Sequence, residues 1–309
     1  MNLLGKTGVR VGRIGFGGAQ IGFEKTEQRH VEEIVNLLQE SGNNVIDTAS
    51  FYRESEWKIG KAIRGKRQDF FLSTKCGLRP GQPDGRKGRL IGVGKSIIRH
   101  PAILPDWNPR LMQWSIEQSL RNLQTEYIDL IQLHSCAVDQ IAQGVQILER
   151  AKAAGKTRAI GYSGDGEAAL YAVRCGQLDV LQISVNIADQ NALREVLPAA
   201  KQQGMGVIAK RPLANVLWKL RQRPENQHNH AYWERLQLLN YEFPDDGIEE
   251  ALQFTLTVPE VDVAIVGTTS PKNFSRDIAV SRRKMDADRF VDIRRRWEEV
   301  AAPGWVGQT

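Results

Sequence analysis

The chain has 309 residues, of which 41% are hydrophobic and 25% are charged, and its formal net charge is +6. This composition is typical of a soluble globular protein, and no apolar run reaches the roughly 18 residues of a membrane span. The N-terminus also lacks the charged and then apolar pattern of a secretory signal. We therefore expect a cytoplasmic protein, folded as one domain over residues 1–309.

The predicted elements follow one another in a regular order. Residues Leu4–Val11 predict a tight hairpin, which we expect to close one end of the fold. Apolar runs of β type then alternate with amphipathic helical stretches. Eight strands are predicted, at Gly12–Gly17, Asn44–Asp47, Phe70–Lys75, Tyr127–His134, Arg158–Ser163, Val180–Val185, Gly206–Lys210 and Val261–Gly267.

The clearest helix signal lies at Asn108 and Pro109. Asparagine is a favoured N-cap, and proline suits the first helical position. Met112, Ile116 and Leu123 then recur at helical spacing, which indicates one apolar face directed toward a sheet.

Short apolar strands separated by helices predict a parallel sheet covered by helices, and eight strands can close into a barrel. The competing architecture is an open doubly wound sheet, usually marked by GxGxxG after its first strand. The segment Gly15–Gln20 is rich in glycine but lacks that spacing. We therefore predict an α/β fold, a (β/α)8 TIM barrel with an N-terminal β-hairpin and long loops at its C-terminal face.

Two irregular segments are predicted as long loops, Cys76–Trp107 and Ala214–Asp246. Trp107, Trp218 and Trp233 could line an apolar pocket or pack within their own loops. Most of the net charge lies near the first loop, because seven basic residues stand against two acidic ones over residues 79–110. We favour a solvated basic loop over a local anionic ligand, and we expect no nucleic-acid surface.

The three cysteines show no CxxC spacing, which fits a reducing compartment. A zinc site built from Cys76, His134 and Cys136 is conceivable, but it lacks a spaced pair of ligands. We therefore expect no metal.

Three successive strands end in ionisable groups: Asp47 with Tyr52 close behind it, Lys75, and His134. In a parallel barrel these side chains meet at the carboxyl end of the strands. A tyrosine phenol is a poor acid at neutral pH, but a nearby ammonium paired with a carboxylate favours the phenolate. Tyrosine could then protonate a carbonyl oxygen that histidine holds, while a nicotinamide cofactor supplies the hydride.

Two alternatives use the same residues differently. Asp47 and Lys75 could form a purely structural ion pair with Tyr52 packed nearby. Lys75 could also be the Schiff-base nucleophile of an aldolase.

The segments Asp47–Tyr52, Ser73–Lys75 and Tyr127–His134 resemble motifs of the aldo-keto reductase family, and the likeness covers nearly the whole chain. The resemblance implies a (β/α)8 barrel whose catalytic tetrad is Asp47, Tyr52, Lys75 and His134, with Tyr52 as the general acid. It also implies a cofactor site made of Gly18, Ala19, Gln20, Asp47, Ser163, Gly164, Gln182, Lys210, Arg211, Pro212, Leu213, Gly267, Thr268, Thr269, Asn273 and Asp277.

The chain departs from the family pattern at several cofactor positions. Gly164 replaces an asparagine that contacts the nicotinamide amide, and Asn186 could compensate. Lys210 stands where many members have an aromatic residue; it could reach the cofactor pyrophosphate, with Arg211 as an alternative, or pair with a neighbouring acid.

The basic residue of many NADP-preferring members is missing at Gly267, Thr269 and Asn273, and Lys272 is adjacent but out of register. We expect NADP, with NAD as a serious competitor.

The resemblance therefore implies reduction of an aldehyde or ketone to an alcohol. The alternative is a cofactor-sensing regulatory barrel with slow or no turnover. The expected partner is a small carbonyl compound, with no membrane involved; its identity, the oligomeric state and the roles of the segment 79–110 and of Lys210 stay open.

Overall fold

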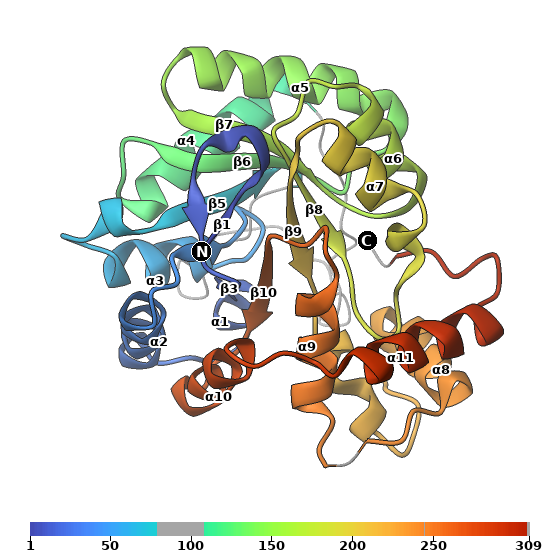
Figure 1. Cartoon of the computed structure of the whole chain (residues 1–309). Helices are drawn as coiled ribbons and strands as arrows, with labels where there is room; N and C mark the ends of the chain where they lie inside the picture. The colour runs from blue at the N-terminus through green and yellow to red at the C-terminus, as the bar shows by residue number, and fades with distance from the viewer. Residues whose placement is uncertain (79–107, 244, 308–309) are drawn as a thin grey trace, which may run out of the picture.

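A closed barrel of eight parallel strands forms the centre of the molecule (Figure 1). The computed structural model describes residues 1–78, 108–243 and 245–307. The strands are β3 (Ile14–Gly17), β4 (Val45–Asp47), β5 (Phe71–Cys76), β6 (Ile128–His134), β7 (Thr157–Ser163), β8 (Val180–Ser184), β9 (Gly206–Lys210) and β10 (Val263–Gly267). They pair in chain order, and β10 closes the ring against β3. The predicted barrel is confirmed, with every strand within two residues of its expected bounds.

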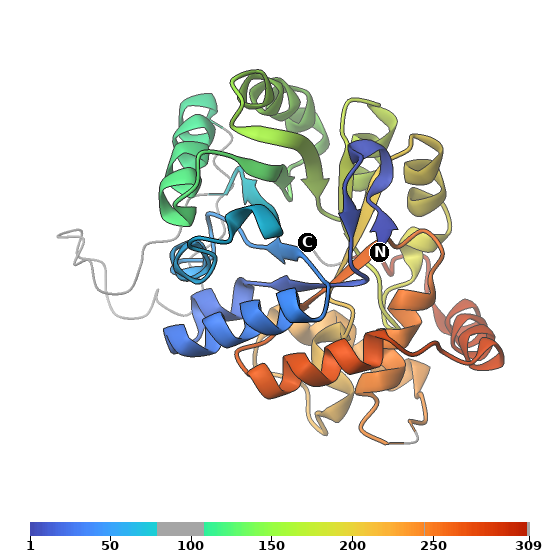
Figure 2. The same cartoon turned by 60° about the vertical axis from the view of Figure 1, so that its left-hand side comes forward.

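Helices surround the barrel on its outside (Figures 1 and 2). They are α1 (Ala19–Phe23), α2 (Gln28–Glu40), α3 (Ser55–Ala62), α4 (Pro109–Leu123), α5 (Val138–Ala153), α6 (Gly166–Arg174), α7 (Val196–Gln202), α8 (His230–Leu239), α9 (Ile248–Thr257), α10 (Pro271–Ser281) and α11 (Ala287–Val300). Short 3₁₀ turns lie at Gly5–Thr7, Arg67–Asp69, Asn191–Leu193, Ala214–Lys219 and Gln227–Asn229. None of the helices in the described ranges is long and apolar enough to cross a membrane.

Helix α4 begins where the sequence predicts. The Asn108 side chain accepts a hydrogen bond of 2.9 Å from the backbone N–H of Arg110, and Pro109 is the first helical residue. Met112, Ile116 and Leu123 are buried on the face that packs toward the barrel. The amphipathic pattern therefore places α4 on the sheet as expected.

The N-terminal hairpin closes the amino end of the barrel. Its strands β1 (Asn2–Leu3) and β2 (Arg10–Val11) pair antiparallel. Leu4 and Val11 are fully buried in the interior cluster with residues from the starts of the barrel strands. The hairpin is confirmed, but its first strand lies just before the predicted segment: Asn2 pairs with Val11 and Leu3 with Arg10, and the residues from Leu4 to Val9 form the connection.

The barrel interior changes from apolar to polar along the strands. In β5, Phe71 belongs to the interior apolar cluster, while Leu72 and Cys76 pack outward against the helices. Because side chains alternate along a strand, Ser73 and Lys75 face the interior above Phe71. The same alternation in the other strands makes the interior apolar at the amino end of the barrel and polar at its carboxyl end.

The prediction of a long loop over 214–246 is wrong for part of that segment. Helix α8 lies within it and buries Tyr232, Leu236 and Leu239, which follow each other at helical spacing. The many polar residues around these positions conceal the periodicity in the sequence. Of the first predicted loop, residues 79–107 lie outside the described residues, and so do Trp107 and nearly all of the basic segment 79–110.

Trp218 and Trp233 both pack within the segment 214–246 to which they belong. The Trp218 indole N–H donates to the carbonyl of Asp246 at 2.9 Å, and its ring lies 5.3 Å from that of Phe243. The Trp233 indole N–H donates to the carbonyl of Leu220 at 3.0 Å. Both therefore help to hold the chain between β9 and α9 together.

Candidate active site

A buried ion pair joins the ends of β4 and β5. Lys75 Nζ lies 2.6 Å from Asp47 Oδ2 and donates a second hydrogen bond of 2.9 Å to the carbonyl of Thr48. The Ser73 hydroxyl donates to the other carboxylate oxygen of Asp47 at 3.0 Å. Asp47 and Lys75 are each only 2% exposed. Such a pair is tolerated in a core because its charges are opposite and its hydrogen bonds are made.

Tyr52 lies beside this pair in the turn that follows β4. Its backbone N–H donates to the carbonyl of Ala49 at 2.9 Å, which fixes the turn. The centroid of its ring is 5.3 Å from Lys75 Nζ. A Cβ atom at Gly22 would lie 2.1 Å from the Tyr52 carbonyl oxygen, so glycine is required for α1 to pack against this turn. The turn and α1 together hold the phenol at the barrel mouth.

His134 at the end of β6 completes the group. Its ring is 5.9 Å from the Tyr52 ring, centroid to centroid, and almost perpendicular to it. Burial holds the pKa of His134 well below the usual value, and the positive charges of Lys75, Lys210 and Arg211 lower it further. The imidazole is therefore neutral at neutral pH and can donate one hydrogen bond.

The structure thus places the four predicted catalytic residues, Asp47, Tyr52, Lys75 and His134, at one end of the barrel. One buried atom among them, Nδ1 of His134, has no hydrogen-bond partner in the described part of the chain. Tyr52 and His134 are only half-buried, so the group is open toward the mouth.

A chain of polar groups crosses the interior beneath this site. The Gln132 amide donates to Ser73 Oγ at 2.9 Å and to Gln182 Oε1 at 3.0 Å. A Cβ atom at Gly161 would lie 2.6 Å from the carbonyl oxygen of Val180 and 3.2 Å from Gln132 Cγ, so glycine is required here first by the backbone of the neighbouring strand. Gln182, a predicted cofactor residue, is therefore coupled through Gln132 to the Asp47 carboxylate. Gln132 was not predicted as a site residue, although its place two residues before His134 makes it point inward.

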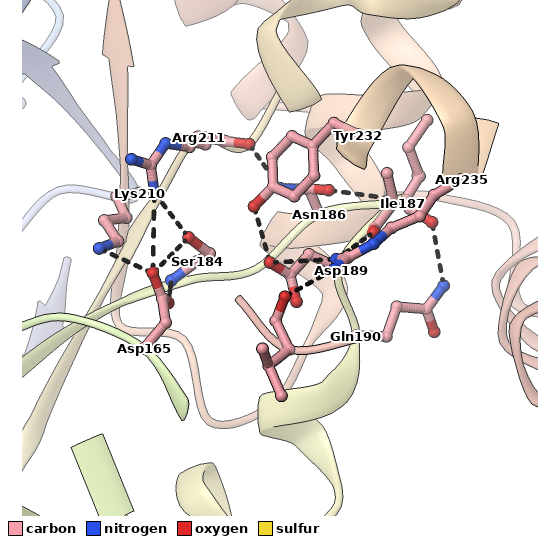
Figure 3. A network of polar contacts seen from close by, with 12 residues as sticks. Asp165, Ser184, Asn186, Ile187, Asp189, Gln190, Lys210, Arg211, Tyr232 and Arg235 are labelled. Atoms are coloured by element: carbon pink, nitrogen blue, oxygen red, sulfur yellow. Dashed lines mark hydrogen bonds and ion pairs between the residues drawn. The ribbon is translucent and has the colours of Figure 1, made fainter. Parts of the chain in front are cut away.

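Lys210 is part of a second buried ion pair (Figure 3). Its Nζ lies 2.9 Å from Asp165 Oδ2, and this carboxylate also accepts the backbone N–H and the hydroxyl of Ser184 at 2.7 and 3.1 Å. Arg211 donates to the same hydroxyl at 3.0 Å. Burial lowers the pKa of Lys210 to about 8, against the opposing effect of Asp165. Of the partners considered for Lys210, a neighbouring acid is the one observed, and Asp165 was not singled out by the sequence.

Both ends of the Asn186 side chain are hydrogen-bonded to the backbone around it. Its amide N–H₂ donates to the carbonyl of Arg211 at 3.0 Å, and its Oδ1 accepts from the N–H of Ala188 at 2.8 Å (Figure 3). Both ends of the side chain thus hold the loop after β8. This arrangement argues against the suggestion that Asn186 supplies the contact to the nicotinamide amide that is missing at Gly164.

The turn from β10 into α10 has features that suit the adenosine end of a dinucleotide. Ser270 caps α10 by accepting the N–H of Asn273 at 3.4 Å. Asp277 is 2% exposed, and its Oδ1 has no hydrogen-bond partner among the described residues. Burial raises the pKa of Asp277 to about 7. A helix amino end favours phosphate, and an unpaired buried carboxyl group favours a ligand with a donor.

All predicted cofactor residues lie at the carboxyl end of the barrel or in the helix beyond it. They are Gly18, Ala19 and Gln20 after β3, Asp47 on β4, Ser163 at the end of β7 with Gly164 after it, Gln182 on β8, Lys210 at the end of β9 with Arg211, Pro212 and Leu213 after it, and Gly267, Thr268, Thr269, Asn273 and Asp277 from β10 into α10. Within the described ranges, no group of three or more histidine, cysteine, aspartate or glutamate side chains is placed to hold a metal ion.

The barrel agrees with a comparison to known proteins. Residues 13–298 match the family model described as "Aldo/keto reductase family". The chain belongs to the aldo-keto reductase family. Members of this family are oxidoreductases that act on small carbonyl compounds.

Several relatives show how the likeness is distributed. The "uncharacterized oxidoreductase YqkF" of Bacillus subtilis is 26% identical over 301 residues, which cover 91% of this chain and 90% of that one. The "NADH-specific methylglyoxal reductase" of Escherichia coli is 29% identical over 68% of this chain and 66% of its own length. The holo form of the aldo-keto reductase AKR11C1 of Bacillus halodurans superposes with a TM-score of 0.78 at 25% identity, covering 97% of both chains.

Proposed function

We propose that the chain reduces an aldehyde or ketone to an alcohol with a nicotinamide dinucleotide, and that Tyr52 is the general acid. One observation carries the proposal: the Tyr52 ring centroid lies 5.3 Å from Lys75 Nζ and 5.9 Å from the centroid of the His134 ring, at the carboxyl end of the barrel. Membership in the aldo-keto reductase family supports it.

Each residue has a role that its surroundings explain. The Lys75 ammonium stabilises the negative charge left on the Tyr52 oxygen when the phenol gives up its proton. Asp47 orients that ammonium through the bond of 2.6 Å. Neutral His134 donates a hydrogen bond to the carbonyl oxygen and so holds the substrate for protonation.

A bound nicotinamide dinucleotide supplies the hydride, which none of these side chains can provide. Ser163 and Gln182 would hold its carboxamide, and Lys210 or Arg211 would approach its pyrophosphate. The residues from Gly267 to Asp277 would bind the adenosine end. We propose NADP(H) as the cofactor, while the name of the E. coli relative keeps NADH in consideration for this chain.

The surroundings of Lys75 argue against an aldolase. A Schiff-base lysine must lose its proton to attack a carbonyl carbon. Here Nζ donates to a carboxylate and to a backbone carbonyl, and an attack on a carbonyl carbon would break these hydrogen bonds.

The first test is the variant Tyr52→Phe. Loss of a general acid lowers turnover by roughly 10²–10⁴-fold, while the ring that packs in the turn is kept. We expect carbonyl-dependent oxidation of NADPH, followed at the nicotinamide absorbance over a panel of aldehydes and ketones, to fall in that range. The dissociation constant for NADPH should change little. Tyr171→Phe, at an exposed tyrosine of α6, is the matched control.

Unchanged turnover in Tyr52→Phe would remove Tyr52 from the mechanism. A wild-type protein that binds dinucleotide but reduces no carbonyl compound would favour the regulatory barrel. Absence of binding to both NADPH and NADH would overturn the proposed function altogether.

A further inference from the structure

Gln132 on β6 is the middle member of a chain of hydrogen bonds that crosses the barrel interior. Its amide nitrogen donates to Ser73 Oγ at 2.9 Å and to Gln182 Oε1 at 3.0 Å. Ser73 in turn donates its hydroxyl proton to Asp47 at 3.0 Å. Gln132 and Ser73 are 0% exposed, and Gln182 is 1% exposed. The chain therefore runs from a buried carboxylate to an amide near the polar end of the barrel.

The Asp47 carboxylate fixes the direction of every hydrogen bond in this chain. It forms an ion pair with Lys75, and a carboxylate can only accept hydrogen bonds. The single hydroxyl proton of Ser73 goes to Asp47, so the Ser73 oxygen must accept from Gln132. The end of the Gln132 amide that faces Ser73 is therefore its nitrogen. Because the same nitrogen also faces Gln182, the end of Gln182 on this side must be its oxygen.

The orientation of Gln132 leaves one polar atom without a partner. Its Oε1 is buried and accepts no hydrogen bond from the described part of the chain. With the amide reversed, Oε1 would face Ser73 Oγ with no proton between the two oxygens, and the amide nitrogen would lose its bond to Ser73. Buried polar groups are normally paired, so the observed orientation is the less costly of the two.

The fixed oxygen of Gln182 decides where its amide nitrogen points. Among the described residues this nitrogen has no acceptor, yet it is not one of the buried atoms that lack a partner, so solvent reaches it. It is thus directed away from Gln132, into the polar carboxyl end of the barrel. An amide nitrogen can only donate, and a ligand that meets Gln182 here must offer an acceptor.

We propose that Gln132 is a positioning residue, which locks the Gln182 amide so that Gln182 donates to the oxygen of the nicotinamide carboxamide. The inference rests on the proposed function, because it deepens the description of the same cofactor site. The carboxamide nitrogen is then left for the hydroxyl of Ser163, the Cα partner of Gln182 on β7. One locked donor and one hydroxyl can orient a carboxamide, although Gly164 offers no side chain for this purpose.

The test measures binding of reduced dinucleotides without a carbonyl substrate. Calorimetry gives dissociation constants for NADPH, for its 3-acetylpyridine analogue and for 2′,5′-ADP. The analogue keeps the oxygen of the carboxamide but carries a methyl group in place of its nitrogen, and 2′,5′-ADP has no nicotinamide. The variants are Gln182→Met and Gln132→Met, which preserve the length of the side chain. Gln190→Met is the matched control, because it removes an amide that is also 0% exposed from the segment after β8.

We expect Gln182→Met to weaken NADPH and the acetylpyridine analogue by the same factor, about five- to ten-fold. The reason is that the variant loses a donor to the oxygen that both ligands share. Binding of 2′,5′-ADP should stay within about two-fold of wild type, which also shows that the variant is folded.

Gln132→Met should weaken the analogue about three-fold more than it weakens NADPH, because the amide of Gln182 is no longer locked. The Gln182 oxygen can then turn and accept from the carboxamide nitrogen of NADPH, whereas the analogue has no such donor. A loss of packing alone would affect the two ligands equally. Gln190→Met should leave all three dissociation constants within about two-fold of wild type.

The proposal is overturned if Gln182→Met weakens NADPH but not the analogue, because Gln182 then accepts from the carboxamide nitrogen. It is also overturned if Gln132→Met leaves the ratio of the two dissociation constants unchanged, if it weakens 2′,5′-ADP as much as NADPH, or if Gln190→Met has the same effect. These results leave the proposed function intact, because the wild type still binds the dinucleotide. If wild type binds neither NADPH nor NADH, the proposed function and this inference fail together.

Discussion

Lys210 and Asp165 form a buried ion pair close to the first one, which joins Lys75 and Asp47. Asp165 is 5% exposed, and its two oxygens accept from Lys210 and from Ser184. A buried pair of this kind adds little net stability, but removal of one partner leaves a costly isolated charge. The pair therefore acts mainly to hold the segment after β9 against the segment after β7.

A double-mutant cycle tests this role. We expect Asp165→Asn to lower the free energy of unfolding by about 3–5 kcal/mol, because it leaves the Lys210 ammonium without its carboxylate. The double variant Asp165→Asn with Lys210→Met should lose less than the sum of the single changes, since no isolated charge remains. Urea unfolding of the four proteins gives the coupling energy. Strict additivity would show that the two side chains do not depend on each other.

The start of α4 shows how a helix boundary is set by a few atoms. Asn108 satisfies one of the N–H groups that a helix leaves unpaired at its amino end, and Pro109 has no N–H to satisfy. The buried face of the helix then follows from the spacing of Met112 and Ile116. The cap fixes the residue at which the helix begins, and the apolar face fixes the side that packs on the sheet.

The variant Asn108→Ala should lower the free energy of unfolding by about 1 kcal/mol, because the N–H of Arg110 loses its acceptor. Asn108→Asp keeps an acceptor at the same place and serves as the matched variant, with nearly wild-type stability expected. Thermal and urea unfolding of both proteins provide the comparison. Equal stability of the alanine and aspartate variants would show that the cap contributes nothing.

Burial of titratable groups makes the stability of the molecule depend on pH in two opposite ways. The pKa of His134 is held well below its usual value, so the unfolded chain takes up a proton first as the pH falls below about 6.5. The contribution of His134 to the free energy of unfolding is thus lost as the pH falls. The pKa of Asp189 is raised to about 7 by burial, so the unfolded chain releases this proton at a lower pH than the folded protein does. The contribution of Asp189 to the free energy of unfolding is therefore lost as the pH rises toward 7.

These opposing effects are separated by comparing variants. In His134→Gln the first effect is absent and the carboxylates are unchanged. We expect wild type to lose about 1 kcal/mol more stability than this variant between pH 6.5 and pH 5.5, since one proton corresponds to at most about 1.4 kcal/mol per pH unit. Urea unfolding at pH 7.5, 6.5 and 5.5 measures the difference. Parallel pH profiles would mean that His134 titrates normally.

Much of the candidate site could be predicted because it depends on local pattern. Asp47, Lys75 and His134 end strands, and the carboxyl ends of parallel strands must meet at one rim. Asp165 and Gln132 were not predicted, because their importance depends on which strand faces which across the interior.

The sequence by itself determined the alternation of strands and helices, the amino end of α4 and the chemical groups at each strand end, since these follow from spacing along one segment. Only the tertiary structure decided that Lys210 pairs with Asp165, that Asn186 is occupied by the backbone and that α8 fills the segment after β9. The physical reason is that these contacts join residues distant in the chain, and their energies depend on burial and direction, which arise only when the barrel is closed.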